Sequence, residues 1–385
     1  MSRPSPAPPR AAPRLRHAAR AARAARAAAL LLLPLALAAP RAAGDPPDPL
    51  ADEIARHSTY LSSTESANPI FADVKSFAAP TLERAETARR DGRRLLALLR
   101  VAAVRLDVEA ARFLLERSAA GAPDEAAFEA EWKRQTEQAA SEAAPDLDGL
   151  HPAALRAIAE TALYQAPILR TTSLDYGRAT QPDTGLFYLG QARAQQELAA
   201  LCLALPAEGA ARPEPALRDL GPELDALEAE LLAAYGPPAS VDHHGEFITV
   251  SSFLKQAREM NGQGARAGAL LAYLQAAMRF HPLRAAAAEP PAPAPAAAEL
   301  AASLESAARA FAADERDQSL GQLCVEIGQS DLAAPLGNAG PQLAAAIVAD
   351  VLPRYAAALR PPAAVAERPA VPVEVTVTLV RWPFT

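Results

Sequence analysis

The densest group of side chains able to do chemistry lies at residues 242–246, where the sequence reads Asp-His-His-Gly-Glu. Imidazole and carboxylate groups are ligands that zinc and iron accept in proteins. The sequence therefore predicts His243, His244 and Glu246 as candidate metal ligands. A second interpretation stays open, because the segment follows a Gly-Pro-Pro run and precedes a predicted helix. It can be a solvated loop in which Glu246 favours the positive end of the helix dipole.

His243 and Glu246, followed by Phe247, resemble the core of the imelysin family motif, Gly-x-His-x-x-Glu. The resemblance implies a secreted helical protein of similar length that uses this cluster in the cell envelope. Val241 stands where the family has glycine, so the motif is matched only in part.

Ser252 and Lys255 fit Ser-x-x-Lys, which resembles the nucleophile motif of penicillin-recognising serine enzymes. A lysine one helical turn away can take the serine proton if burial lowers its pKa. The partner motifs of those enzymes are absent, since Lys75 is followed by Ser-Phe and Ser330-Asp331 by leucine. The chain also has no phosphate-binding loop and no dinucleotide glycine fingerprint. We therefore expect no catalytic residues and no organic cofactor.

The remaining polar residues give weaker signals. His57, His151 and His281 have no partners at ligand spacing, and the charged residues of 81–119 are expected on a solvated helix face. Cys202 and Cys324 each lie between apolar residues. They are expected as two buried thiols, although one long-range disulfide is the alternative.

Helices must position all these residues, because apolar side chains recur with a period near 3.6 along most of the chain. A helix start is also expected at 182–184, where Asp183 or Thr184 can cap the first N–H groups. The predicted helices cover about 50–62, 69–79, 81–119, 124–143, 152–166, 183–205, 222–235, 247–261, 265–280, 298–312, 314–329 and 341–359.

Residues 250–283 resemble a tetratricopeptide repeat, a helical hairpin with large and small residues at set positions. The matching residues are Phe253, Ala257, Met260, Gly264, Ala269, Tyr273, Ala276 and Pro282, the last one residue later than usual. The resemblance implies a concave surface for protein or peptide, with Phe253, Met260 and Tyr273 as candidate contact residues. An ordinary hairpin inside an irregular bundle is the alternative, because solenoids need about three stacked units.

The N-terminus has the pattern of a secretion signal. Residues 1–26 contain seven arginines and no acid, and an apolar run follows from Ala27 to Ala39. That run is too short to span a bilayer and ends in small residues, so cleavage is expected near Ala38 and the protein is predicted to be periplasmic or extracellular. Without residues 1–38, 31 basic residues face 45 acids, a net charge of −14. Such a charge repels phosphate backbones, so no nucleic acid partner is expected.

Two further segments differ from the helical pattern. Residues 285–298 alternate alanine and proline, which favours an extended linker or exposed loop. Residues 371–380 alternate β-branched and polar side chains, which predicts one C-terminal strand. A single strand must pack on its own protein or dock on a partner.

The sequence therefore predicts an all-α protein, an irregular helical bundle or a short α-solenoid of helical hairpins, with one C-terminal β-strand. The predicted order is a signal peptide (1–38), a disordered lead-in (39–49), a main helical domain (50–284), the linker (285–298), C-terminal helices (299–360) and a Pro-rich segment with the strand (361–385). The predicted function is binding or scaffolding of a protein or peptide, with no transmembrane segment. The alternatives are a metal-binding envelope protein and a surface protein whose strand docks on a partner.

Overall fold

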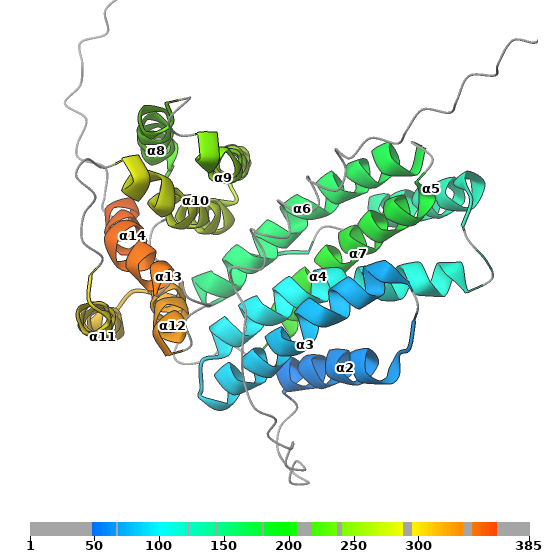
Figure 1. Ribbon diagram of the computed structural model, residues 1–385, viewed down its shortest axis with the longest axis horizontal. Helices are drawn as coiled ribbons and strands as arrows, with labels where there is room; N and C mark the ends of the chain where they lie inside the picture. The colour runs from blue at the N-terminus through cyan, green and yellow to red at the C-terminus, as the bar shows by residue number, and fades with distance from the viewer. Residues whose placement is uncertain are drawn as a thin grey trace, which may run out of the picture.

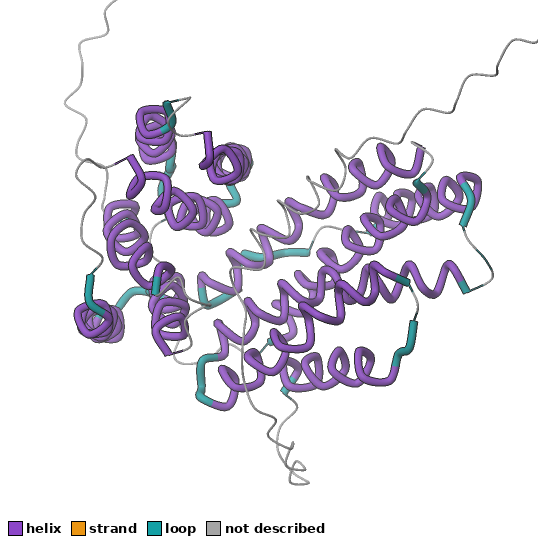
Figure 2. Tube along the Cα trace, in the orientation of Figure 1, coloured by secondary structure: helices purple, strands orange, loops and turns teal. Residues whose placement is uncertain are grey.

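The computed structural model describes residues 48–359, except 67, 120, 122, 143–144, 149, 179–180, 206–216, 237–240, 288–294 and 334–340. The predicted signal peptide and the predicted strand at 371–380 lie outside these residues. Within them every regular element is a helix and none is a strand, which confirms the all-α class (Figure 2). No helix in this part of the chain is long and apolar enough to cross a bilayer.

Figure 1 shows long helices lying side by side in one bundle, with a group of shorter helices gathered at one end of it. The bundle contains α2 (Pro49–Ser63), α3 (Pro69–Arg90), α4 (Arg94–Ser118), α5 (Glu125–Ser141), α6 (Ala153–Arg178) and α7 (Pro182–Ala204). The second group contains α8 (Gly221–Ala234), η1 (Val241–His243), α9 (His244–Gly262), α10 (Arg266–Ala287), α11 (Ala297–Ala313), α12 (Ser319–Ala333), α13 (Gln342–Ala346), the π-helical turn η3 (Ile347–Val351) and α14 (Leu352–Ala358).

One hydrophobic core joins the two groups, because α10 and α12 both pack on α6. Its buried side chains run from Leu50 to Ala358 and include Leu300 and Leu304 of α11. The helices on both sides of the predicted linker therefore share a core. Two smaller clusters fill the spaces between α2, α3 and α4 and between α4, α5 and α7.

Several helices begin where the sequence offers a side-chain cap. The carboxylate of Asp48 accepts from the first N–H groups of α2, so that helix begins inside the segment predicted as a disordered lead-in. Asn68 caps α3 and Asp124 caps α5 in the same way. Each of these oxygens satisfies an N–H group that the helix itself leaves unpaired.

The predicted boundary at residue 80 is wrong, because α3 continues through Pro80 to Arg90. The break falls at residues 91–93, where Gly92 has a φ of 79°, a conformation that favours glycine. The predicted end near residue 166 is also wrong, since α6 continues through Pro167 to Arg178. α10 likewise passes Pro282 and ends at Ala287. Packing on neighbouring helices outweighs the lost backbone hydrogen bond at each proline.

Two helices begin without a side-chain cap from their own segment. No side-chain cap forms at the start of α7, so the predicted capping by Asp183 or Thr184 is wrong. α6 is capped from a distance: the backbone N–H of Ala153 donates to Asp317, and that of Ala154 donates to Ser319. α12 begins at Ser319, later than the predicted start at 314, and the two residues that make this cap lie at its beginning.

α9 and α10 form the helical hairpin predicted at 250–283. The two helices pack closely, with Ala257, Ala269 and Ala276 fully buried and Gly264 in the turn. The hairpin packs on α6, α8 and the C-terminal helices. Whether it is a tetratricopeptide-like unit stays a prediction.

Cys202 and Cys324 are free and buried, which confirms the expected pair of thiols and excludes the disulfide. Burial raises the pKa of each thiol to about 12, so both stay protonated at neutral pH.

Candidate functional site

The predicted metal ligands of residues 242–246 lie at the junction of η1 and α9. His243 Nδ1 is 4.0 Å from Glu246 Oε2. His244 Nδ1 instead shares a hydrogen bond with the hydroxyl of Tyr235 at 2.8 Å, and the His244 ring stacks on Phe247. In this arrangement His244 is engaged with aromatic neighbours, and metal binding by the three residues stays a prediction.

Ser252 and Lys255 are both exposed on α9 and contact other groups. The Ser252 hydroxyl donates to the carbonyl of Ile248, and Lys255 Nζ lies 3.8 Å from Glu259. Because Lys255 is exposed and paired with a carboxylate, this pair lacks the buried, desolvated base that serine activation needs.

The three predicted contact residues differ in exposure. Met260 and Tyr273 are fully buried between α9, α10 and their neighbours, and Phe253 is only partly exposed. A partner could therefore touch only Phe253 of the three in this conformation.

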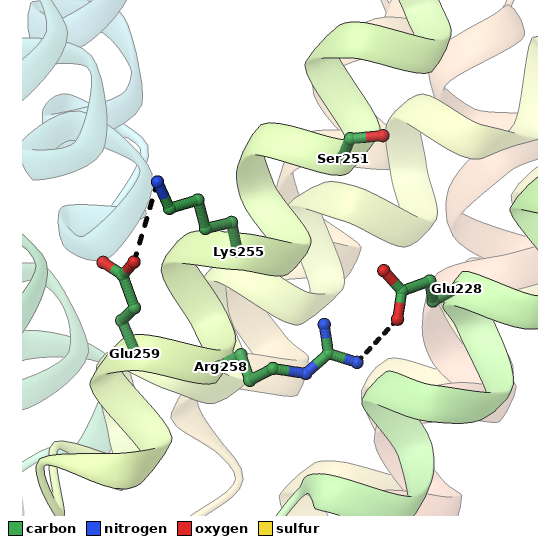
Figure 3. Close-up of a pocket in the computed structure, with 5 residues that line it drawn as sticks. All are labelled: Glu228, Ser251, Lys255, Arg258 and Glu259. Atoms are coloured by element: carbon green, nitrogen blue, oxygen red, sulfur yellow. Dashed lines mark hydrogen bonds and ion pairs between the residues drawn. The ribbon is translucent and has the colours of Figure 1, made fainter. Parts of the chain in front are cut away.

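A surface groove of about 350 Å³ lies between α8 and α9 (Figure 3). Glu228 of α8 faces Arg258 of α9, and Ser251, Lys255 and Glu259 complete the lining. The two basic and two acidic side chains balance each other in charge.

Exposed apolar side chains flank this groove. Leu232 is 61% exposed and lies one helical turn beyond Glu228, and Ile248 is 50% exposed and lies one turn before Ser251. Residues three or four apart share a helix face, so these side chains extend the groove as an apolar strip. The stacked rings of Tyr235 and Phe247, 4.2 Å apart, lie at the same end. We call the groove with these flanking residues the α8–α9 groove.

A second site lies inside the bundle and was missed by the sequence analysis. Glu53 and His57 of α2 and Glu109 of α4 are buried, and one ligand atom from each lies within 4.8 Å of the other two. Among the described residues, no other set of three His, Cys, Asp or Glu side chains brings its ligand atoms this close together. We call it the Glu-His-Glu cluster.

Two expectations are corrected by this cluster. His57 has partners after all: its Nε2 is 3.0 Å from Glu53 Oε1, and its Nδ1 is 3.8 Å from Glu109 Oε1. The charged residues of 81–119 do not all lie on a solvated face, because Arg105 and Glu109 are buried. The i,i+4 spacing of Glu53 and His57 was visible in the sequence, but the approach of α4 was not.

Arginines surround the cluster. Arg105 pairs with Glu53 and also donates to Glu197 of α7 at 2.7 Å. Arg56 lies 2.6 Å from Glu109 and 2.8 Å from Glu53, while Arg112 reaches the second oxygen of Glu109. Arg105 is almost fully buried, whereas the side chains of Arg56 and Arg112 are 39% and 33% exposed.

Of the cluster, Glu109 borders a cavity of about 10 Å³ between α4 and α7, whose lining also includes Arg112, Arg193 and Glu197. The two helices can come this close because Gly190 has no side chain: a Cβ there would lie only 2.8 Å from the Cα of Ala110. A space of this size is about that of one water molecule.

Burial lowers the pKa of His57 to about 4, and the nearby Arg56 guanidinium adds to this effect. The imidazole is therefore neutral at pH 7, because protonation would place a positive charge in a buried site beside a guanidinium. His281 also has a partner that the sequence did not reveal, since its Nδ1 is 2.6 Å from the buried Asp350 of the π-helical turn.

We expect the metal-free protein to lose about 3 kcal/mol of unfolding free energy through His57 as the pH falls from about 6.5 to about 4. The sign follows because the unfolded chain binds the proton at a higher pH than the folded one. The measurement is urea unfolding in chelator at several pH values, with His57→Gln as the comparison. Parallel stability profiles for the two proteins would contradict the expectation.

The comparisons give no relative to place beside these sites. No family model, no curated protein and no solved structure matches the chain. The class of protein is therefore defined by fold alone: a helical bundle with an attached group of shorter helices. Its function must be inferred from the two sites.

Proposed function

We propose that this chain is an exported helical protein that binds a segment of another protein or a peptide in the α8–α9 groove. The observation that carries the proposal is the exposure of Leu232 and Ile248, which are 61% and 50% exposed and lie one helical turn from the groove residues Glu228 and Ser251. Large apolar side chains gathered at a groove are typical of interaction sites. The arginine-rich leader and apolar run at the N-terminus support export.

The chemistry of the groove indicates the kind of partner. Its charges balance, so a strongly charged ligand gains nothing there, and a net acidic protein repels nucleic acid. An amphipathic helical segment fits best, with apolar side chains against Leu232 and Ile248 and polar ones against Lys255 and Glu259.

The test is selection of peptides from a displayed library on the purified protein. The selected peptides are expected to bind Leu232→Glu and Ile248→Glu at least about tenfold more weakly, because a charge then faces the apolar side chain of the peptide. Both positions are exposed, so folding is retained. The matched control is Leu203→Glu on α7, where the side chain is 41% exposed away from the groove. Equal binding to all four proteins would reject the proposal.

The C-terminal residues provide a second arm of the experiment. If residues 371–385 of the same chain occupy the groove, peptide binding strengthens when they are deleted. Binding that stays the same after deletion supports an external partner. Absence of binding in both forms contradicts the proposal.

A further inference from the structure

The Glu-His-Glu cluster brings together the side chains of a metal site from two helices. Glu53 and His57 lie one turn apart on α2, and Glu109 approaches from α4. One imidazole and two carboxylates are donors that zinc, iron(II) and manganese(II) accept. The three ligand atoms, within 4.8 Å of one another, can surround one ion after small side-chain movements.

The hydrogen bonding of the cluster is incomplete without a further cation. A neutral imidazole donates through one nitrogen and presents a lone pair on the other. His57 Nε2 is 3.0 Å from Glu53 Oε1 and 3.3 Å from the Arg56 guanidinium, and Nδ1 is 3.8 Å from Glu109 Oε1. When Nε2 carries the proton, the Nδ1 lone pair therefore faces the Glu109 carboxylate. Glu109 Oε1 is buried and accepts no hydrogen bond of good geometry from a described donor, although Arg56 lies 2.6 Å away.

The positive charges around the two carboxylates leave a way for a metal ion to bind, because two of the three arginines are partly exposed. The two carboxylates of the cluster are accompanied by one buried cation, Arg105, which is shared with Glu197. The remaining neutralising charges come from Arg56 and Arg112, whose partly exposed side chains can turn into solvent. The cavity beside Glu109 has room for about one water.

We propose that Glu53, His57 and Glu109 bind one divalent transition-metal ion of the zinc, iron(II) or manganese(II) type between α2 and α4. The site is distinct from the α8–α9 groove and from residues 242–246. It ties the first helix of the described chain to the centre of the bundle.

The test starts from the purified full chain, stripped with a chelator and titrated with Zn²⁺ by calorimetry. One Zn²⁺ per chain is expected, and His57→Gln or Glu109→Gln should weaken binding by at least about tenfold. His243→Ala and Glu246→Gln are the matched controls and should leave binding unchanged. The visible spectrum of the Co²⁺-substituted protein should change in His57→Gln and stay constant in the controls.

The variant Arg56→Gln distinguishes a metal site from a simple ion-pair network. The Arg56 side chain is 39% exposed, so the substitution does not disturb a fully buried position. Removal of this competing cation should tighten Zn²⁺ binding, by about tenfold if one charge interaction is relieved. Unchanged or weaker binding in Arg56→Gln overturns the proposal, as does a wild-type protein that takes up no stoichiometric Zn²⁺. Loss of Zn²⁺ binding in His243→Ala would also overturn the proposal, because it would place the metal site at residues 242–246. Peptide binding in the groove is measured separately, so either proposal can fail alone.

Discussion

Replacement of Arg105 by alanine is expected to lower the unfolding free energy by about 3–5 kcal/mol. The Arg105 side chain is 7% exposed and contacts Glu53 and Glu197, so its removal leaves the buried Glu53 carboxylate without its main counter-ion. The lost packing of the arginine stem adds to the effect. Urea unfolding at neutral pH in the presence of a chelator gives the value.

The matched control is Arg193→Ala, which also removes an arginine paired with Glu197. Arg193 is 46% exposed, and an exposed ion pair contributes up to about 1 kcal/mol. The double variant Arg105→Ala, Glu53→Gln should recover part of the loss, because the unpaired charge is removed as well. Equal losses for Arg105→Ala and Arg193→Ala would show that burial of this pair has no energetic consequence.

Phe128→Ala is expected to cost about 3–5 kcal/mol, the range for a large aromatic side chain removed from a core. Phe128 is fully buried and is the residue by which α5 enters the bundle. Its ring fills a space that two glycines leave open: a Cβ at Gly177 would lie 2.0 Å from the ring, and one at Gly185 would lie 2.7 Å from it. These helices cannot close over the space that alanine would leave without a backbone shift.

Thermal and urea unfolding measure this loss, with Lys133→Ala as the control. Lys133 lies on the same helix with its side chain 75% exposed, so its replacement should change stability by less than about 0.5 kcal/mol. A loss below about 1 kcal/mol for Phe128→Ala would mean that α5 is held mainly by other contacts, such as the hydrogen bond from Trp132 to the Arg170 carbonyl.

Local sequence signals determined most of the helical structure. Apolar periodicity predicted α2, α5, α8, α9 and the start of α10 to within a few residues, because a period of 3.6 and its end signals are properties of neighbouring residues. The apolar neighbours of Cys202 and Cys324 were likewise enough to predict buried thiols. The three predicted metal ligands at 242–246 remain candidates on sequence grounds alone.

Only the tertiary structure decided which polar residues meet. Glu109 and Arg105 look like members of a solvated helix face, and they become buried because α2 and α7 cover that face of α4. The same is true of the cap on α6, which Asp317 supplies from 164 residues away. Contacts of this kind depend on how helices pack, and the pattern within one helix carries no information about the charges that its neighbours bring.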